Sequence, residues 1–303
     1  MIACVATTPS VDRLLHVAGP VRPGAIHRPA EVVAVAGGKG LNVARAAAAL
    51  GAEVVAVAPL GGHGGRWIAA ELEREGIEVR TIPVAAEPRV CVSVAGDAAG
   101  LTEFYEPAAP LSEEEWFELE VAVTTIAERV GWVTLSGSVP PGAPADGHAR
   151  LVRLARAGGA RVALDAHGDA LRSGLEAGPD LVKVNAEEAE ELLGRGAGAA
   201  ALRERAGGGE RAAAITHGPR GMELADSEGN VYRAAPPNVG RFPVGSGDAL
   251  LAGMVTALDV GGGWPAALVL GVGAGAAAAE VPGAGRLDGA RARELAVQIA
   301  GAL

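Results

Sequence analysis

Residues 52–76, AEVVAVAPLGGHGGRWIAAELEREG, contain the unit that decides the fold, a strand followed at once by a helix. The run 52–60 is almost entirely apolar and rich in Val and Ala, as expected for a strand covered on both faces. From residue 65 apolar and charged residues alternate at helical spacing, and Gly76 marks the end of the helix. This succession predicts part of a right-handed crossover between parallel strands.

The same alternation continues along the rest of the chain. Short apolar runs predict further strands, and Ala-, Arg- and Glu-rich runs between them predict helices. The predicted strands are 130–137, 160–166, 180–186 and 211–218, and the predicted helices include 146–159 and 186–195. The chain is therefore expected to form one α/β domain over residues 1–303, with a mostly parallel sheet covered on both faces.

Two regions interrupt the alternation of strands and helices. Residues 12–36 and 81–107 alternate apolar and polar residues in places, and the second region has turn signals at Gly96 and Gly100. This pattern predicts antiparallel strands that lie outside the parallel sheet. A small sheet attached to an α/β body suggests a lid over a site at the carboxyl ends of the parallel strands.

The composition excludes several classes of protein. A net charge of −10 leaves no broad basic face for nucleic acid, although a local patch could still bind a small anion. The two cysteines and six histidines show no metal-ligand spacing, which favours a reduced, cytoplasmic protein. The start of the chain lacks a basic segment and a signal-peptide apolar run.

One uncharged stretch, residues 260–279, is long enough to span a membrane. Three consecutive glycines, 261–263, and Pro265 interrupt it, and most of the remainder is Ala and Gly. We expect a loop followed by a buried helix of small residues, and no association with a membrane.

Lysine is rare in this chain, because only Lys39 and Lys183 are found among 26 basic residues. A background of arginine makes both lysines candidates for places that need a compact ammonium group. The alternative is that both are chance surface residues.

The stretch AVAGGKGLNVARAAAALG (34–51) places Lys39 within a glycine turn before a helix that begins near Leu41. Consecutive glycines let backbone amides approach an anion, and the helix N-terminus adds a positive field. The order of residues differs from a P-loop, since GxxxxGK[ST] occurs nowhere in the chain. A plain glycine turn is the alternative.

The stretch PVGSGDALLAG (243–253) has the same physical features and adds a carboxylate. Gly245, Ser246 and Gly247 form a turn before a helix, and Asp248 follows them directly. Asp248 could simply be an acid in the first helical turn, where the helix dipole favours it. Alternatively, the free amides hold a phosphoryl group while Asp248 accepts a proton from an attacking hydroxyl.

Three further strand ends carry polar turns. In KVNAEEAEELLG (183–194), Asn185 and Glu188 could form a capping box, which we favour from the residues alone, or act on a hydrated Mg²⁺. The turns THGPRG (216–221) and LSGSVPPG (135–142) are ambiguous by themselves. The glycine-rich run 271–279 does not follow a strand, so it does not predict a dinucleotide site.

The order of these motifs is more specific than any one of them. Together with TPSVD (8–12) and VPGAG (281–285), they span nearly the whole chain. This chain resembles the ribokinase-like (phosphofructokinase B) carbohydrate kinases, and within them the 1-phosphofructokinase and tagatose-6-phosphate kinase branch. The resemblance implies a three-layer α/β/α fold with a small β lid, and phosphorylation of a sugar hydroxyl that depends on ATP and Mg²⁺.

The resemblance also implies roles for individual residues. Asp248 is implied to be the catalytic base, and Gly245, Ser246 and Gly247 the anion hole. The implied sugar-side residues are Asp12, Gly38, Lys39, Asn42, Arg89 and Ser138, of which Lys39 and Arg89 hold a phosphate already on the substrate. The implied nucleotide-side residues are Lys183, Asn185, Glu188, Thr216, Gly218, Gly221 and Gly275, of which Asn185 and Glu188 act on Mg²⁺ indirectly and Gly275 leaves room beside the adenine.

The chain departs from the pattern of this branch at three places. Thr8 stands where NPxxD has Asn, Pro88-Arg89-Val90-Cys91 replaces TRTN, and Lys183-Val184-Asn185 replaces KPN. The first two departures lie on the lid and sugar side, so they leave the identity of the sugar open.

We therefore expect a cytoplasmic kinase that converts fructose 1-phosphate to fructose 1,6-bisphosphate with ATP. The alternatives are a tagatose-6-phosphate kinase, a kinase of an unphosphorylated sugar or nucleoside, and a sensor of sugar phosphate or nucleotide without catalysis. A homodimer formed through the lid is plausible, because it would cover exposed strand edges.

Overall fold

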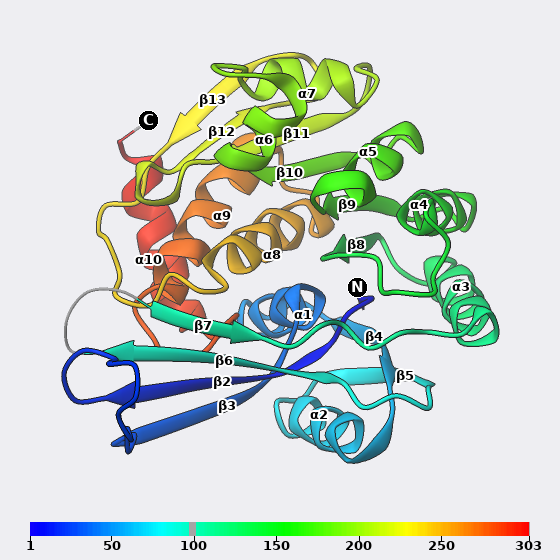
Figure 1. The fold of residues 1–303 in the computed structure, drawn as a ribbon. Helices are drawn as coiled ribbons and strands as arrows, with labels where there is room; N and C mark the ends of the chain where they lie inside the picture. Colours follow the sequence, from blue (N-terminus) through cyan, green and yellow to red (C-terminus); the bar gives the residue numbers. More distant parts are fainter. Residues whose placement is uncertain (97–100, 303) are drawn as a thin grey trace.

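A computed structural model describes residues 1–96 and 101–302. A large sheet lies between two layers of helices, and a smaller sheet lies beside this body (Figure 1). The large sheet has the order β13-β12-β11-β10-β9-β8-β1-β4-β5. Neighbouring strands from β11 to β5 are parallel, whereas β12 and β13 add an antiparallel edge. The expected three-layer, mostly parallel fold is therefore confirmed.

The strands of the large sheet are short, and most of their residues are buried. Their bounds are β1 Ile2–Ala6, β4 Val54–Leu60, β5 Glu78–Pro83, β8 Trp132–Ser136, β9 Arg161–Asp165, β10 Leu181–Asn185, β11 Ala212–Thr216, β12 Met222–Ala225 and β13 Val231–Ala234.

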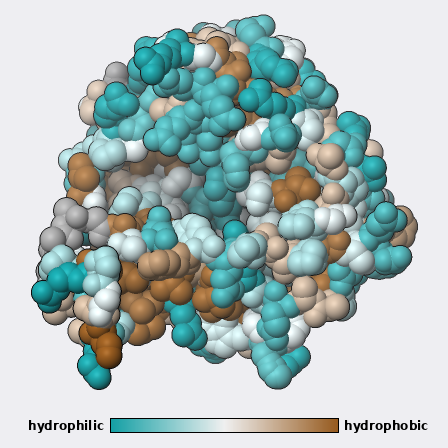
Figure 2. Space-filling model, in the orientation of Figure 1, coloured by the Kyte–Doolittle hydropathy of each residue, from teal (hydrophilic) through white to brown (hydrophobic). Residues whose placement is uncertain are grey.

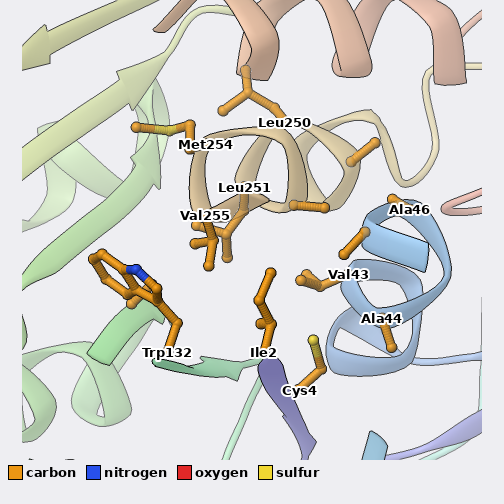
Figure 3. Packing of buried hydrophobic residues seen from close by; sticks show 14 of the residues in the cluster. Ile2, Cys4, Val43, Ala44, Ala46, Trp132, Leu250, Leu251, Met254 and Val255 are labelled. Atoms are coloured by element: carbon orange, nitrogen blue, oxygen red, sulfur yellow. The ribbon is translucent and has the colours of Figure 1, made fainter. Parts of the chain in front are cut away.

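The helices cover the sheet in two layers because the side chains of each strand alternate between its faces. In β1, Ile2 and Cys4 belong to one apolar cluster, and Ala3 and Val5 belong to the other. Figure 3 shows Ile2 and Cys4 directed toward helices α1 and α8. The first layer contains α1 Lys39–Ala49, α2 Gly62–Arg74, α8 Ser246–Asp259, α9 Trp264–Ala278 and α10 Gly289–Ala300. The second layer contains α3 Glu113–Ala127, α4 Gly147–Ala157, α5 Gly168–Glu176, α6 Ala186–Leu193 and α7 Ala199–Arg205.

Small residues bring α8 and α9 into close contact. A Cβ atom at Gly253 would lie 2.6 Å from the carbonyl oxygen of Leu270, so only glycine fits there. The run 260–279 forms a loop and then the buried helix α9, as expected from its sequence. Within residues 1–96 and 101–302, the structure contains no helix with the length and apolar character needed to cross a membrane.

The smaller sheet, which we call the lid, has the order β3-β2-β6-β7. Its strands are β2 Ser10–Val17, β3 Glu31–Gly37, β6 Arg89–Gly96 and β7 Leu101–Tyr105. The expectation of antiparallel strands is wrong for β2 and β6, which pair in parallel. Both strands leave the carboxyl edge of the large sheet, β2 after β1 and β6 after β5, so they enter the lid from the same end.

The outer bounds expected for the second lid segment also need correction. Residues 81–83 belong to β5, which pairs with β4 in the large sheet. The sequence predicted these residues to be part of the lid because β5 is an edge strand. Its exposed polar residues alternate with apolar ones, as in a strand of a small antiparallel sheet. The turn expected at Gly100 lies outside the described residues.

Candidate active site

The polar motifs meet where the carboxyl ends of β9 and β10 face the first turns of α1 and α8. Asp165 ends β9, and Lys183 lies in β10 two residues before its end. Lys39 is the first residue of α1, and Asp248 is in the first turn of α8. Four segments that are far apart in the sequence thus contribute charged side chains to one place.

Both lysines of the chain bind the same carboxylate. Lys39 Nζ lies 3.0 Å from Asp165 Oδ1, and Lys183 Nζ lies 2.7 Å from Asp165 Oδ2. The side chains of Asp165 and Lys183 are 0% and 5% exposed, whereas that of Lys39 is 34% exposed. Neither lysine is therefore a chance surface residue.

The two ammonium groups fix the charge of Asp165. Burial by itself would raise the pKa of this carboxyl group, but Lys183 and Lys39 outweigh burial and lower the pKa to about 2. In turn, the Asp165 carboxylate raises the pKa of Lys39 above its ordinary value despite partial burial. Asp165 and Lys39 are therefore both charged near neutral pH.

Asp165 belongs to none of the sequence motifs that predict the site. Its run was interpreted only as a strand, although an acid at the end of a buried apolar strand was a signal that could have found it. The lysines that make its burial possible are 126 and 18 residues away in the sequence.

Asp248 has its carboxyl group buried beside α1. Its Oδ2 accepts a hydrogen bond of 2.8 Å from Asn42 Nδ2. Burial and the charge of Asp165 raise the pKa of Asp248 to about 6, although Lys39, Lys183 and Asn42 act in the opposite direction. A carboxyl group with this pKa changes its protonation close to neutral pH, which suits a general base.

The turn before Asp248 leaves two helical amides free. Gly245 is the N-cap of α8 with φ 80°, and a Cβ atom there would lie 2.6 Å from the amide nitrogen of Gly285. The amide of Ser246 donates to the carbonyl of Pro243 at 3.1 Å. In the described chain the amides of Gly247 and Asp248 have no backbone acceptor, and the buried Ser246 Oγ has no partner. These groups can receive an anion.

Gly247 also determines how closely Lys183 approaches this turn. A Cβ atom at Gly247 would lie 3.0 Å from Lys183 Nζ, so any larger residue would press on the ammonium group. A cation and two free amides thus face the same small space at the N-terminus of α8.

The lid contributes a second group of polar residues. Asp12 in β2 accepts a hydrogen bond of 2.6 Å from Ser10 Oγ, and burial raises its pKa although Arg89 and Arg45 partly offset this. The Arg89 Nε atom is buried without a hydrogen-bond partner among the described residues. A Cβ atom at Gly37 would lie 2.1 Å from Asp12 Cγ, so only glycine leaves room for this carboxylate.

A cleft of about 730 Å³ separates the lid from the body, and Figure 2 shows the surface hollowed there. Asp12, Cys91 and Tyr105 line it from the lid, and residues 240–244 and 282–284 line it from the body. Cys91 is opposite Asp12 in the sheet register, so the departure from the TRTN pattern lies beside that acid.

The remaining sugar-side candidates are Gly38 and Ser138, whose backbone makes close contacts, and Asn42, whose side chain lies next to Asp248. Gly38 has φ 95°, and a Cβ atom there would lie 2.8 Å from the carbonyl oxygen of Thr8. Ser138 accepts a hydrogen bond of 2.6 Å at its carbonyl oxygen from Thr7 Oγ1. The Asn42 Oδ1 atom is buried and unpaired in the described chain, which leaves an acceptor next to Asp248.

Asn185 and Glu188 form a capping box at the start of α6. The Asn185 amide donates to Glu188 Oε2 at 2.8 Å, and the Glu188 amide donates to Asn185 Oδ1 at 2.9 Å. The capping box favoured from the sequence is therefore confirmed. The other carboxylate oxygen, Oε1, lies 4.0 Å from Lys39 Nζ and so faces the charged centre.

Four nucleotide-side candidates lie at the end of β11, in the turn after it and in α9. Thr216 ends β11, and Gly218 and Gly221 flank a turn with φ values of 58° and 90°. A Cβ atom at Gly275 would lie 3.1 Å from the carbonyl oxygen of Ser246, so close packing of α9 on α8 accounts for this glycine. Its role beside an adenine stays a prediction.

Comparison with known proteins identifies the family of the chain. The pfkB family of carbohydrate kinases matches residues 1–288. The chain is 33% identical to a 1-phosphofructokinase of Rhodobacter capsulatus over 278 residues, which are 86% of this chain and 84% of the relative. It is 32% identical to the ATP-dependent 6-phosphofructokinase isozyme 2 of Escherichia coli over 250 residues, 80% of this chain and 81% of that one.

Solved structures show the same fold over nearly the whole chain. The tetrameric inhibited form of phosphofructokinase-2 from Escherichia coli superposes with a TM-score of 0.87 at 29% identity, covering 99% of both chains. Family match, sequence relatives and fold thus agree with one another, and the chain belongs to the pfkB family of carbohydrate kinases.

Proposed function

We propose that this protein is an ATP-dependent kinase that phosphorylates a hydroxyl group of a phosphohexose, with fructose 1-phosphate as the acceptor and fructose 1,6-bisphosphate as the product. One observation carries the proposal. The buried carboxyl group of Asp248, with a pKa of about 6, lies at a helix N-terminus beside two lysines. The relative from Rhodobacter capsulatus supports fructose 1-phosphate as the acceptor.

Asp248 is assigned as the general base. Its carboxylate takes the proton of the acceptor hydroxyl as that oxygen attacks the γ-phosphorus atom and the bond to the β-phosphate oxygen breaks. The hydrogen bond from Asn42 fixes the carboxyl orientation, so the other oxygen atom remains free to receive the proton. The free amides of Gly247 and Asp248 and the Ser246 hydroxyl lie where they can hold the transferring group.

Lys39 and Arg89 are assigned to the phosphate that the acceptor already carries, and Asp12 to its hydroxyl groups. The part of Lys39 that remains exposed and the unpaired Nε of Arg89 leave donors for a dianion. Gly38, Asn42 and Ser138 complete the acceptor side. Because the protein carries a net charge of −10, these local cations are needed to attract an anionic sugar.

Lys183, Asn185, Glu188, Thr216, Gly218, Gly221 and Gly275 are assigned to the nucleotide side. The glycine at 247 lets the Lys183 ammonium lie close to the free amides at the start of α8, and this set of donors fits the phosphates of a nucleoside triphosphate. Mg²⁺ would neutralise the phosphate oxygens when bound. Glu188 Oε1 is the oxygen left free by the capping box, and the described residues hold no cluster of three or more metal-ligating side chains. This donor set fits an ion held mainly by phosphates and water.

A panel of acceptors tests the assignment. Steady-state rates with ATP and Mg²⁺ are measured for fructose 1-phosphate, tagatose 6-phosphate, fructose 6-phosphate, fructose and a nucleoside. The highest kcat/KM is expected for fructose 1-phosphate. A preference for an unphosphorylated acceptor would remove the roles assigned to Lys39 and Arg89.

Fructose 6-phosphate is the second candidate acceptor, because the Escherichia coli relative is a 6-phosphofructokinase with the same fold. The two acceptors carry their phosphate at opposite ends of the sugar. The neighbouring lid residues Asp12 and Cys91 would therefore face different hydroxyl groups in the two acceptors.

A further inference from the structure

We propose that Asp165 is a positioning residue of this active site, whose single carboxylate holds Lys39 and Lys183 in place and whose negative charge acts on Asp248. The proposal rests on the proposed kinase function. None of the sequence motifs includes this residue, and Asp165 acts through its neighbours instead of touching a substrate.

The geometry of Asp165 is that of a fixed anchor. Its side chain is 0% exposed, and each carboxylate oxygen accepts from a different lysine, at 3.0 Å and 2.7 Å. The strand end that carries it is held by the Gly137 amide, which donates to the Asp165 carbonyl at 2.9 Å. A buried carboxylate with both oxygens occupied has no freedom to serve as a proton acceptor itself.

The two lysines come from different sides of the site. Lys39 begins α1 and also faces Glu188, whereas Lys183 lies in β10 against Gly247. Without Asp165 the two ammonium groups would repel each other in a poorly solvated space. With it, the group of three keeps one net positive charge, which an incoming phosphate can use while both ammonium groups stay in position.

Asp165 also determines the electrostatic environment of Asp248. Burial raises the pKa of Asp248 most, and the negative charge of Asp165 raises it further. Lys39 from α1 and Lys183 from β10 lower it, as does the hydrogen bond from Asn42. Removing the Asp165 charge lowers the pKa of Asp248 directly, and it also frees both lysines to act more strongly on Asp248. Both effects have the same sign.

The variant Asp165→Asn of the full chain tests the proposal. The measurements are KM for ATP, KM for the acceptor that the panel identifies, and the pH profile of kcat/KM. Both KM values should rise about tenfold, as for the loss of a hydrogen bond to a charged group. The acidic limb of the profile should move to lower pH, a change that a purely structural role would not produce.

Two matched variants separate charge from position. Asp165→Glu keeps the charge but displaces the carboxylate, so the acidic limb should stay near its original position while both KM values remain raised. Asp226→Asn removes another buried acid, which accepts hydrogen bonds from Asn230 in the turn between β12 and β13. It should leave both KM values and the limb unchanged, which controls for general loss of stability.

Asp165→Asn could fail to fold because it leaves two buried ammonium groups unpaired. The comparison of Lys183→Met with the double variant Lys183→Met/Asp165→Asn avoids this, since only the partly exposed Lys39 then loses its partner. The acidic limb of the double variant should lie at lower pH than that of Lys183→Met. A double variant that does not fold would make Asp165 a folding requirement and overturn the proposal.

ATP affinity measured by calorimetry without any acceptor separates this proposal from the proposed function. It should weaken in Asp165→Asn even if the acceptor panel contradicts fructose 1-phosphate. Unchanged ATP affinity together with an unmoved acidic limb would overturn the role of Asp165, whatever the acceptor is.

Discussion

Asp248 concentrates the proposed chemistry at one side chain. Its carboxyl group is buried, held by Asn42 and placed among two lysines and Asp165. Replacing it by Asn preserves the size of the side chain and removes the proton acceptor. We expect kcat to fall at least about 100-fold, as for other general bases. ATP binding measured by calorimetry should persist.

An unchanged kcat in Asp248→Asn would show that another group accepts the proton. A wild-type protein that binds ATP and sugar phosphate but has no kinase activity would instead indicate a sensor. The wild-type rate therefore has to be measured beside the variant.

The raised pKa of Asp248 predicts a pH dependence of the rate. The base acts when it is deprotonated, so the rate should be constant above about pH 6 and fall roughly tenfold per pH unit below it. The measurement is kcat/KM for the acceptor across this range. A rate that stays constant well below that pH would mean that the base titrates at the ordinary value of an aspartate.

Arg89 is expected to act on the acceptor alone. Its charge lies near Asp12, and its Nε atom has no partner in the described chain. Arg89→Ala should raise KM for the phosphohexose about tenfold or more and leave KM for ATP nearly unchanged. Arg80→Ala, an exposed arginine of β5, is the control. Equal effects on both KM values would indicate that Arg89 has a structural role.

At the scale of elements, the capping box of α6 combines a structural role with a proposed functional one. Asn185→Ala removes the side-chain cap and should lower the free energy of unfolding by about 1 kcal/mol. If Asn185 and Glu188 also act on Mg²⁺, the variant should need a higher Mg²⁺ concentration for half-maximal rate.

The chain contains a matched control for this prediction. Ser112 and Glu115 form the same kind of box at the start of α3. Ser112→Ala should cost a similar stability in thermal or urea unfolding, with no change in Mg²⁺ dependence. Equal Mg²⁺ dependence in the two variants would confine Asn185 to capping.

The elements also show where periodicity is informative. Strands buried on both faces and amphipathic helices were predicted close to their observed bounds, because the spacing of their own apolar residues reflects which side chains are buried. The direction of β6 beside β2 was not predictable in the same way. It depends on the path of the chain through β4 and β5, which no local pattern encodes.

At the scale of the whole molecule, the lid has two edge strands, β3 and β7. Exposed apolar residues occur on both, with Val32 at 55% and Phe104 at 60% exposure. Such edges favour pairing with another chain. We expect a homodimer through the lid, whose mass in light scattering would be twice 30.1 kDa, or 60.2 kDa.

Phe104→Lys should shift this assembly toward the monomer and lower activity only if the partner lid helps to close the cleft. Val297→Lys changes an exposed apolar position outside the lid, at 73% exposure on α10, and should not alter the mass. A wild-type protein that stays monomeric at all concentrations would contradict the prediction. The cytoplasmic location also stays a prediction.

The sequence by itself determined the alternation of strands and helices, the two glycine turns and the acid that follows the second. These features depend on residues close together in the chain, where glycine and apolar periodicity act locally. Only the tertiary structure decided that Lys39 and Lys183 share Asp165, and that burial together with the charge of Asp165 raises the pKa of Asp248. Charge pairing and burial depend on which strand ends become neighbours, and in a parallel sheet distant segments meet at one edge.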